Sequence, residues 1–192
     1  MPQICALFCL ALCICTSLAG QSILPKKKPV VTDRSYSFMG LVPGESKAEA
    51  LATLATLPYV EPRCNNDHPV TSGEGLEVCI FYGHLRDDSF SLLLVDGKVA
   101  LITYTFDRGT FNSMVESITE KYGSPKSKDS KTLQNGFGAT FHCAVYVWSR
   151  PLSKITATEF DKADITKSTV DIEDTKLIFK AARRTLASGP KI

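Results

Sequence analysis

The feature that most constrains this chain of 192 residues is the dipeptide Asp96-Gly97, which stands between two apolar, β-branched runs. A two-residue type I′ turn needs positive φ at both central positions, and Asp and Gly tolerate that conformation. The dipeptide therefore predicts a β-hairpin of residues 90–95 and 98–106. The turn sets the register, which pairs Val95 with Lys98, Leu94 with Val99 and Leu92 with Leu101.

Both faces of the predicted hairpin are apolar, because side chains alternate between the two faces of a strand. One face carries Phe90, Leu92, Leu94, Val99 and Leu101. The other carries Leu93, Ala100, Ile102, Tyr104 and Phe106. A hairpin that is apolar on both faces is typical of the centre of a sheet, with at least one face covered by a helix.

The covering helix is predicted directly after the hairpin. Apolar residues recur there at helical spacing and form one side of a helix: Phe111, Met114, Val115, Ile118 and Tyr122. Thr110 is the expected N-cap, and Gly123 followed by Pro125 indicates the end of the helix. The strand–strand–helix unit of residues 90–125 is thus the predicted centre of the fold.

A second helix is predicted near the start of the folded region. Ser46 and Glu49 have the Ser-x-x-Glu spacing of a capping box, in which each side chain bonds to the other residue's backbone amide. This helix would run to about Leu57, since Pro58 cannot continue it.

The remaining segments complete a predicted sheet. Strands are predicted at residues 36–38, 78–82, 139–149, 155–160 and 169–180, whereas residues 59–76 and 124–138 are predicted to be loops. The predicted class is therefore α+β. We expect an antiparallel sheet of about five to seven strands with two helices packed on one face, in a single domain of residues 35–184.

The first 19 residues have the composition of a secretory signal peptide. Residues 4–19 are almost continuously apolar and uncharged, and Ser17 and Ala19 place small residues at positions −3 and −1 of a cleavage point. We therefore expect export to the periplasm or the extracellular space, with an uncleaved anchor as the alternative. Residues 20–34 are predicted to be a flexible lead-in, and residues 185–192 a frayed tail.

Charge and motifs argue against several function classes. The formal net charge of +2 provides no basic field for nucleic acid, and membrane contact is expected to be peripheral at most. The sequence contains no Gly-x-Ser-x-Gly elbow, His-Glu-x-x-His pair, phosphate-binding loop or calcium loop. We therefore expect a non-enzymatic protein with no catalytic residue and no cofactor.

Three cysteines follow the predicted leader: Cys64, Cys79 and Cys143. In an oxidising compartment the simplest arrangement is one disulfide and one free thiol. We favour a Cys64–Cys79 bond, because it would tie the predicted loop 59–76 to a strand. A Cys79–Cys143 bond is the alternative. Under the favoured pairing, Cys143 would be a buried thiol that packs as a small apolar side chain.

Metal and thiol chemistry are the competing interpretations of these cysteines. Cys64 and His68 have zinc-ligand spacing, but a second pair would have to recruit His84 and Cys79. His142 precedes Cys143 on a predicted strand, where adjacent side chains point to opposite faces. We therefore expect neither a metal site nor a catalytic thiol.

Several short motifs carry a resemblance to known proteins, in this order: Phe38-x-Gly40, Pro43-Gly44-x-Ser46-x-Ala48-Glu49-Ala50, Asp96-Gly97-Lys98-Val99, Phe106, Phe111, Lys121-Tyr122-Gly123-x-Pro125 and Trp148. The order resembles small exported, uncharacterised proteins of Gram-negative bacteria. It is more distantly similar to SmpA/OmlA-type outer-membrane assembly lipoproteins and to β-lactamase inhibitor proteins. The resemblance implies a helix followed by a meander of strands, and a role in binding other proteins. The chain departs from the lipoproteins in lacking a good lipobox cysteine.

The resulting hypothesis is an exported protein-interaction module of the cell envelope with a protein partner of unknown identity. Tyr146 and Trp148, on one face of the predicted strand 139–149, are the candidate aromatic anchors. The first alternative is a carrier of a small apolar ligand held between the sheet and the helices. The second is an enzyme without recognisable motifs, built around Glu77, Asp87 and His84.

Overall fold

The computed structural model describes residues 35–57, 63–65, 75–82, 88–134, 138–161 and 163–187. The contacts of the chain divide it into a unit of residues 1–30 and a unit of residues 31–192, and every described residue belongs to the second. The predicted signal peptide and the predicted lead-in lie outside the described residues. Within the described segments, no helix is both long enough and apolar enough to cross a membrane.

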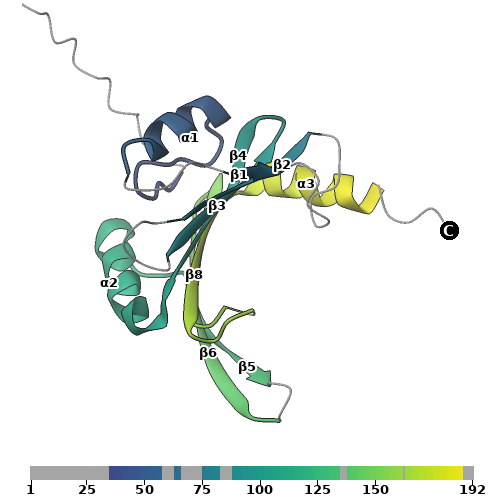
Figure 1. The fold of residues 1–192 in the computed structure, drawn as a ribbon. Helices are drawn as coiled ribbons and strands as arrows, with labels where there is room; N and C mark the ends of the chain where they lie inside the picture. Colours follow the sequence, from purple (N-terminus) through teal and green to yellow (C-terminus); the bar gives the residue numbers. More distant parts are fainter. Residues whose placement is uncertain are drawn as a thin grey trace, which may run out of the picture. The chain divides into compact units, whose positions relative to one another are not determined.

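The described residues form one antiparallel sheet and three α-helices (Figure 1). The strands are β1 (Arg63–Asn65), β2 (Leu76–Tyr82), β3 (Ser89–Val95), β4 (Lys98–Asp107), β5 (Ser127–Gln134), β6 (Thr140–Ser149), β7 (Ser153–Thr158) and β8 (Lys167–Asp174). The helices are α1 (Lys47–Leu54), α2 (Phe111–Tyr122) and α3 (Thr175–Ala187), with a 3-10 turn, η1 (Arg108–Thr110), before α2. The order across the sheet is β1-β2-β3-β4-β8-β7-β6-β5. The α+β class and the antiparallel sheet are confirmed, but the described sheet has eight strands and three helices accompany it.

The main hydrophobic cluster joins α1 and α2 to the sheet. Ala50 and Leu54 enter it from α1, and Phe111 and Ile118 from α2. In Figure 1 these two helices lie to the left of the sheet, whereas α3, in yellow, lies to its right. The capping box of Ser46 and Glu49 forms as predicted at the start of α1, which ends at Leu54 rather than near Leu57.

The turn of the central hairpin forms as predicted. Asp96 and Gly97 both have positive φ, of 52° and 70°. The first two predicted strand pairs are confirmed, Val95 with Lys98 and Leu94 with Val99. This hairpin lies at the centre of the sheet, where β4 is bordered by β3 and β8.

Beyond these pairs the hairpin departs from the predicted register. An irregularity between Leu93 and Leu94 leaves Ala100 as an extra residue on β4, so that Leu92 faces Ile102 instead of Leu101. An extra residue in one strand reverses which of its following side chains point to each face. The predicted face of Ala100, shared with Leu93, is correct, but the predicted faces of β4 are wrong after Ala100: the side chains that join Val99 in the main cluster are Ile102, Tyr104 and Phe106.

Four predicted segments have a different secondary structure. The predicted strand 36–38 contributes only an isolated bridge between Phe38 and Leu41, and the predicted loop 59–76 contains the short strand β1. Residues 169–180 do not form one strand, because β8 ends at Asp174 and α3 follows. The Asp174 carboxylate accepts hydrogen bonds from the backbone N–H groups of Lys176 and Leu177, both at 2.9 Å, which caps the helix. The predicted loop 124–138 contains the edge strand β5, which pairs along its whole length with β6.

Candidate functional site

Trp148, predicted to be an interaction residue, is a core residue. Its side chain is 1% exposed and belongs to the main hydrophobic cluster. The indole Nε1 donates a hydrogen bond to the backbone oxygen of Gly123 at 2.8 Å, which ties β6 to the end of α2. The prediction of an anchor at Trp148 is therefore wrong, because this face of β6 is covered by a helix.

Tyr146 lies on the same face of β6 and is half-buried. Its ring centroid is 5.9 Å from that of Phe111 on α2, and the Lys128 ammonium lies 5.0 Å from the ring centre. The ring is thus held between α2 and β5, and an interaction role for Tyr146 stays a prediction.

The disulfide favoured from the sequence is present. Cys64 and Cys79 are bonded, and they lie directly opposite each other on β1 and β2. Cys79 is buried in the main cluster, whereas Cys64 is exposed. Cys143 is a free, buried thiol, as the favoured pairing required.

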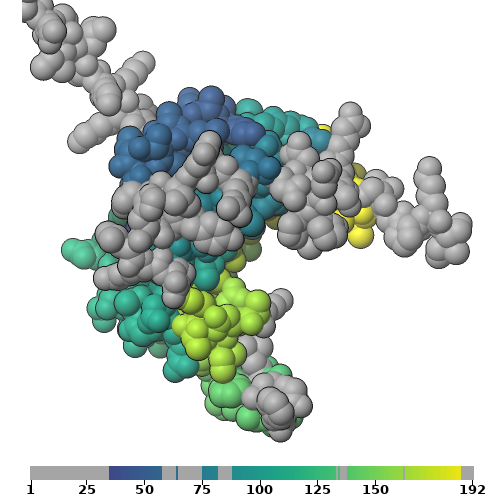
Figure 2. Space-filling model, viewed as in Figure 1, coloured from purple at the N-terminus to yellow at the C-terminus, as the bar shows by residue number. Residues whose placement is uncertain are grey.

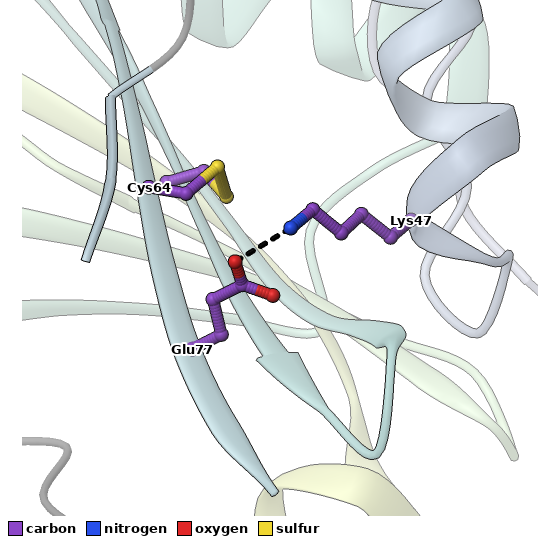
Figure 3. The surroundings of a disulfide bond; sticks show 4 residues. Lys47, Cys64 and Glu77 are labelled. Carbon is purple, nitrogen blue, oxygen red and sulfur yellow. Dashed lines mark hydrogen bonds and ion pairs between the residues drawn. A yellow bond between two sulfur atoms is a disulfide. The ribbon is translucent and has the colours of Figure 1, made fainter. Parts of the chain in front are cut away.

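An ion pair lies beside this disulfide. Lys47 reaches from α1 toward Glu77 on β2, and its Nζ lies 2.5 Å from a carboxylate oxygen of Glu77 (Figure 3). Glu77 precedes Cys79 by two residues on β2, so both side chains point to the face that α1 covers. The carboxylate oxygen and the two sulfur atoms lie within 4.8 Å of one another.

Three residues named for zinc or enzymatic alternatives, His68, His84 and Asp87, lie outside the described residues. Of the remaining candidate pair, His142 is exposed and Cys143 is buried, which places their side chains on opposite faces of β6. The imidazole of His142 is thus not positioned to activate the Cys143 thiol.

Asp171 is a carboxylate in the middle of the sheet that the sequence analysis did not name. It lies on β8 between Thr103 of β4 and Thr156 of β7, and it accepts a hydrogen bond from the Thr103 hydroxyl at 2.6 Å. Burial raises the pKa of Asp171 above the ordinary value for an aspartate, and the nearby carboxylate of Glu173 adds to the increase.

We expect Asp171→Asn to stabilise the protein at neutral pH. A carboxyl group whose pKa is higher in the folded state stabilises the fold fully only below its unfolded pKa, and this contribution is lost as pH rises through the folded pKa. The amide has no charge to desolvate and keeps an oxygen for the Thr103 hydroxyl. Urea unfolding at neutral pH and at about pH 3, below the ordinary aspartate pKa, should show the gain at neutral pH alone.

The matched control is Asp164→Asn. Hydrogen bonds from the hydroxyl and the backbone N–H of Thr166 lower the pKa of Asp164, so its charged form contributes stability above the unfolded pKa. This control should lose a little stability at neutral pH, the opposite sign. A loss of stability in Asp171→Asn at neutral pH would contradict the assignment of a costly buried charge.

The helix α3 is held against the sheet by a second, smaller cluster. Leu177, Ile178 and Ala181 pack against Leu76, Val95, Ala100 and neighbouring residues. At the hairpin turn, the Asp96 carboxylate accepts hydrogen bonds from Lys180 at 2.5 Å and from Arg184 at 2.8 and 3.1 Å. These hydrogen bonds lower the pKa of Asp96 to about 2, and the bonds from Arg184 have the largest effect.

The opposite side of α3 presents cationic and apolar side chains together. Phe179 is 64% exposed and Leu186 is 82% exposed, the two highest values among large hydrophobic residues in the described segments. The Arg183 guanidinium lies 5.6 Å from the centre of the Phe179 ring. We call this the α3 surface, and it comprises Lys176, Phe179, Lys180, Arg183, Arg184 and Leu186; all of these except Leu186 line a shallow hollow.

The α3 surface carries an excess of positive charge. Asp96 is the acidic partner of Lys180 and Arg184. Within the described part of the chain, Lys176 and Arg183 form no ion pair. Part of α3 is visible in yellow at the surface in the space-filling view (Figure 2). A cationic helix surface with an exposed aromatic ring is suited to bind an anionic partner that also carries apolar groups.

No family model, curated protein or solved structure matches this chain. The resemblance to envelope lipoproteins and inhibitor proteins therefore stays a prediction.

The α3 surface was not predicted from the sequence, because residues 169–180 were predicted to be a strand. A signal was present: Asp174 is a good N-cap residue, and Leu177, Ile178 and Ala181 follow at helical spacing. The alternating Val170 and Ile172 just before Asp174 were extended too far as a strand pattern. The exposed Phe179 was consequently assigned to a sheet.

Proposed function

We propose that this protein is an exported, non-enzymatic interaction module that binds an acidic, partly apolar segment of another protein on its α3 surface. The observation that carries the proposal is the exposure of Phe179 and Leu186 beside Lys176 and Arg183. Aromatic and arginine side chains are enriched among the residues that dominate protein interfaces. The leader-like composition of residues 1–19 and the Cys64–Cys79 bond support export to the periplasm or outside the cell.

The other face of the sheet has a structural role in this proposal. The layer beneath α1 and α2 is filled with packed aromatic rings, among them Phe90 and Tyr104 with centroids 4.7 Å apart. This packing supports an arrangement in which α1 and α2 cover one face of the sheet and enclose the core there. It gives the alternative of a small-ligand carrier no comparable support, because the described side chains occupy the layer where the ligand would sit.

The proposal predicts that binding depends on two residues of the α3 surface. A photo-crosslinkable residue at Ala182, exposed on α3, would be used to capture partners of the full chain in a native envelope fraction. Phe179→Ala and Arg183→Glu should each weaken capture of the specific partner about thirtyfold, the effect of losing an interface residue worth about 2 kcal/mol. The crosslinked peptide of the partner should be rich in Asp and Glu.

The controls distinguish specific binding at this surface from non-specific binding. Ile165→Ala removes another exposed apolar residue, 45% exposed and outside α3, and should leave capture unchanged. Vesicles that contain an anionic phospholipid should not retain the wild-type protein at physiological salt. If the vesicles retain the wild-type protein but not Arg183→Glu, the partner of the α3 surface is a membrane rather than a protein. Unchanged capture by both α3 variants would disprove the proposed site.

A further inference from the structure

The corner between β1, β2 and α1 brings three metal-ligating groups together. Cys64 and Cys79 face each other across the two strands, and Glu77 lies on the same face of β2 (Figure 3). Their two sulfur atoms and one carboxylate oxygen lie within 4.8 Å of one another. The spacing of cysteine and histidine in the sequence does not indicate this group, because its third member is a carboxylate two residues before Cys79.

In the oxidised protein the two sulfur atoms are bonded to each other, so a zinc site here requires this bond to open first. Zinc binds thiolate sulfur at about 2.3 Å and carboxylate oxygen at about 2.0–2.2 Å, so two sulfur ligands of a tetrahedral ion lie about 3.8 Å apart. After the sulfur–sulfur bond opens, small rotations of the two cysteine side chains reach this separation. Three protein ligands would then leave a fourth position for water.

We propose that reduction of the Cys64–Cys79 disulfide by a thiol or phosphine reductant creates a zinc site formed by Cys64, Cys79 and Glu77. A phosphine is oxidised to its oxide with the oxygen of one water molecule, and the two hydrogens of that water complete the two thiols. A thiol reductant instead supplies two thiol groups, which become one disulfide and provide the two electrons and the two protons. Zinc binding then releases these two protons and forms two zinc–sulfur bonds. This site is independent of the α3 surface and of the function proposed for it.

Charge balance supports the proposal. Two thiolates and the Glu77 carboxylate carry three negative charges, the zinc ion carries two positive charges, and the Lys47 ammonium beside the site carries one. The sum is zero, as it is for the Lys47–Glu77 pair in the oxidised protein. A partly buried site without net charge avoids the cost of desolvating an unpaired ion. Lys47 would thus be a positioning residue for Glu77 and for the metal site.

Access also supports the proposal. Cys64 is exposed, which places one end of the disulfide at the surface where a reductant can approach, whereas Cys79 is buried in the main cluster. Soft thiolate ligands favour zinc over magnesium or calcium, which prefer oxygen ligands alone. The occupant we assign is therefore zinc, and cobalt is its spectroscopic substitute in the test.

The test is metal titration of the full chain after reduction by a phosphine. We expect one cobalt ion per chain, with the charge-transfer absorption of cobalt–thiolate bonds, and displacement of cobalt by zinc. The oxidised protein and Cys64→Ser should show no such absorption. Glu77→Gln should weaken zinc binding at least tenfold, whereas Glu173→Gln, which breaks the comparable Lys154–Glu173 pair on the sheet, should not change it.

The fold is monitored in the same samples through Trp148, the one tryptophan of the chain. If the reduced protein stays folded, a titration without cobalt–thiolate absorption disproves the site. If reduction exposes Trp148 to solvent, addition of zinc must restore its buried fluorescence, and failure to do so equally disproves the site. If zinc binding is unaffected in Glu77→Gln, Glu77 is not a ligand, and the proposed site of three ligands is wrong.

Discussion

We expect Trp148→Ala to lower the free energy of unfolding by about 3–5 kcal/mol, the range for removing a large aromatic side chain from a core. The substitution leaves a cavity beneath α2 and removes the indole N–H that donates a hydrogen bond from β6 to the Gly123 carbonyl oxygen. Because a domain of this size is stable by about 5–15 kcal/mol in total, a large fraction of its stability depends on this residue. Urea unfolding followed by far-ultraviolet circular dichroism would measure the loss without needing tryptophan fluorescence.

Two further variants separate the contributions of Trp148. Trp148→Phe keeps most of the ring volume but cannot donate to Gly123. Gly123 is exposed, so water can replace the indole donor and the loss should be about 0.5–1.5 kcal/mol, the net contribution of a typical hydrogen bond. Phe179→Ala removes an exposed aromatic ring and should change stability by no more than about 0.5 kcal/mol. If Trp148→Ala were as stable as Phe179→Ala, the placement of Trp148 in the core would be wrong.

The parts of the fold that were predictable from the sequence are those set by local chemistry. The hairpin turn follows from the positive φ of Asp96 and Gly97, and the start of α1 follows from the capping box. The α2 helix follows from the apolar spacing that places Phe111 and Ile118 in the core. Each signal lies within a few residues, so no knowledge of distant contacts was needed.

The parts that were missed depend on neighbours distant in the sequence. The bulge at Ala100 turns Ile102 into the main cluster and leaves a small side chain facing α3, and this arrangement depends on the packing of both layers. The edge strand β5 has almost no apolar residue, so it carries no alternation, and its pairing with β6 alone defines it. Trp148 was predicted to lie at the surface because both faces of β6 are apolar, so the sequence does not show which of them is buried.

The second large effect is expected at the Cys64–Cys79 bond. Reduction should lower the free energy of unfolding by about 3 kcal/mol, because a ring of this size removes that much conformational entropy from the unfolded chain. The sequence separation is 15 residues, and the bond holds the edge strand β1 against β2. Urea unfolding with and without a phosphine reductant would measure the difference in stability.

The free thiol provides the control for this measurement. Cys143→Ser should respond to the reductant as the wild type does, because Cys143 is not part of the bond. The double variant Cys64→Ala and Cys79→Ala should be destabilised from the outset and show no response. A wild-type protein whose stability is unchanged by complete reduction would contradict a stabilising role for the bond.

The proposed metal site predicts that zinc restores the stability that is lost on reduction. A ligand that binds only the folded state at a hundred times its Kd adds about 2.7 kcal/mol of stability, almost the amount that reduction removes. Zinc should therefore return the unfolding midpoint of the reduced wild type to near that of the oxidised protein. It should have no effect on the double variant, which keeps Glu77 but has neither thiolate. A midpoint that zinc shifts equally in both proteins would mean that the ion binds elsewhere on the chain.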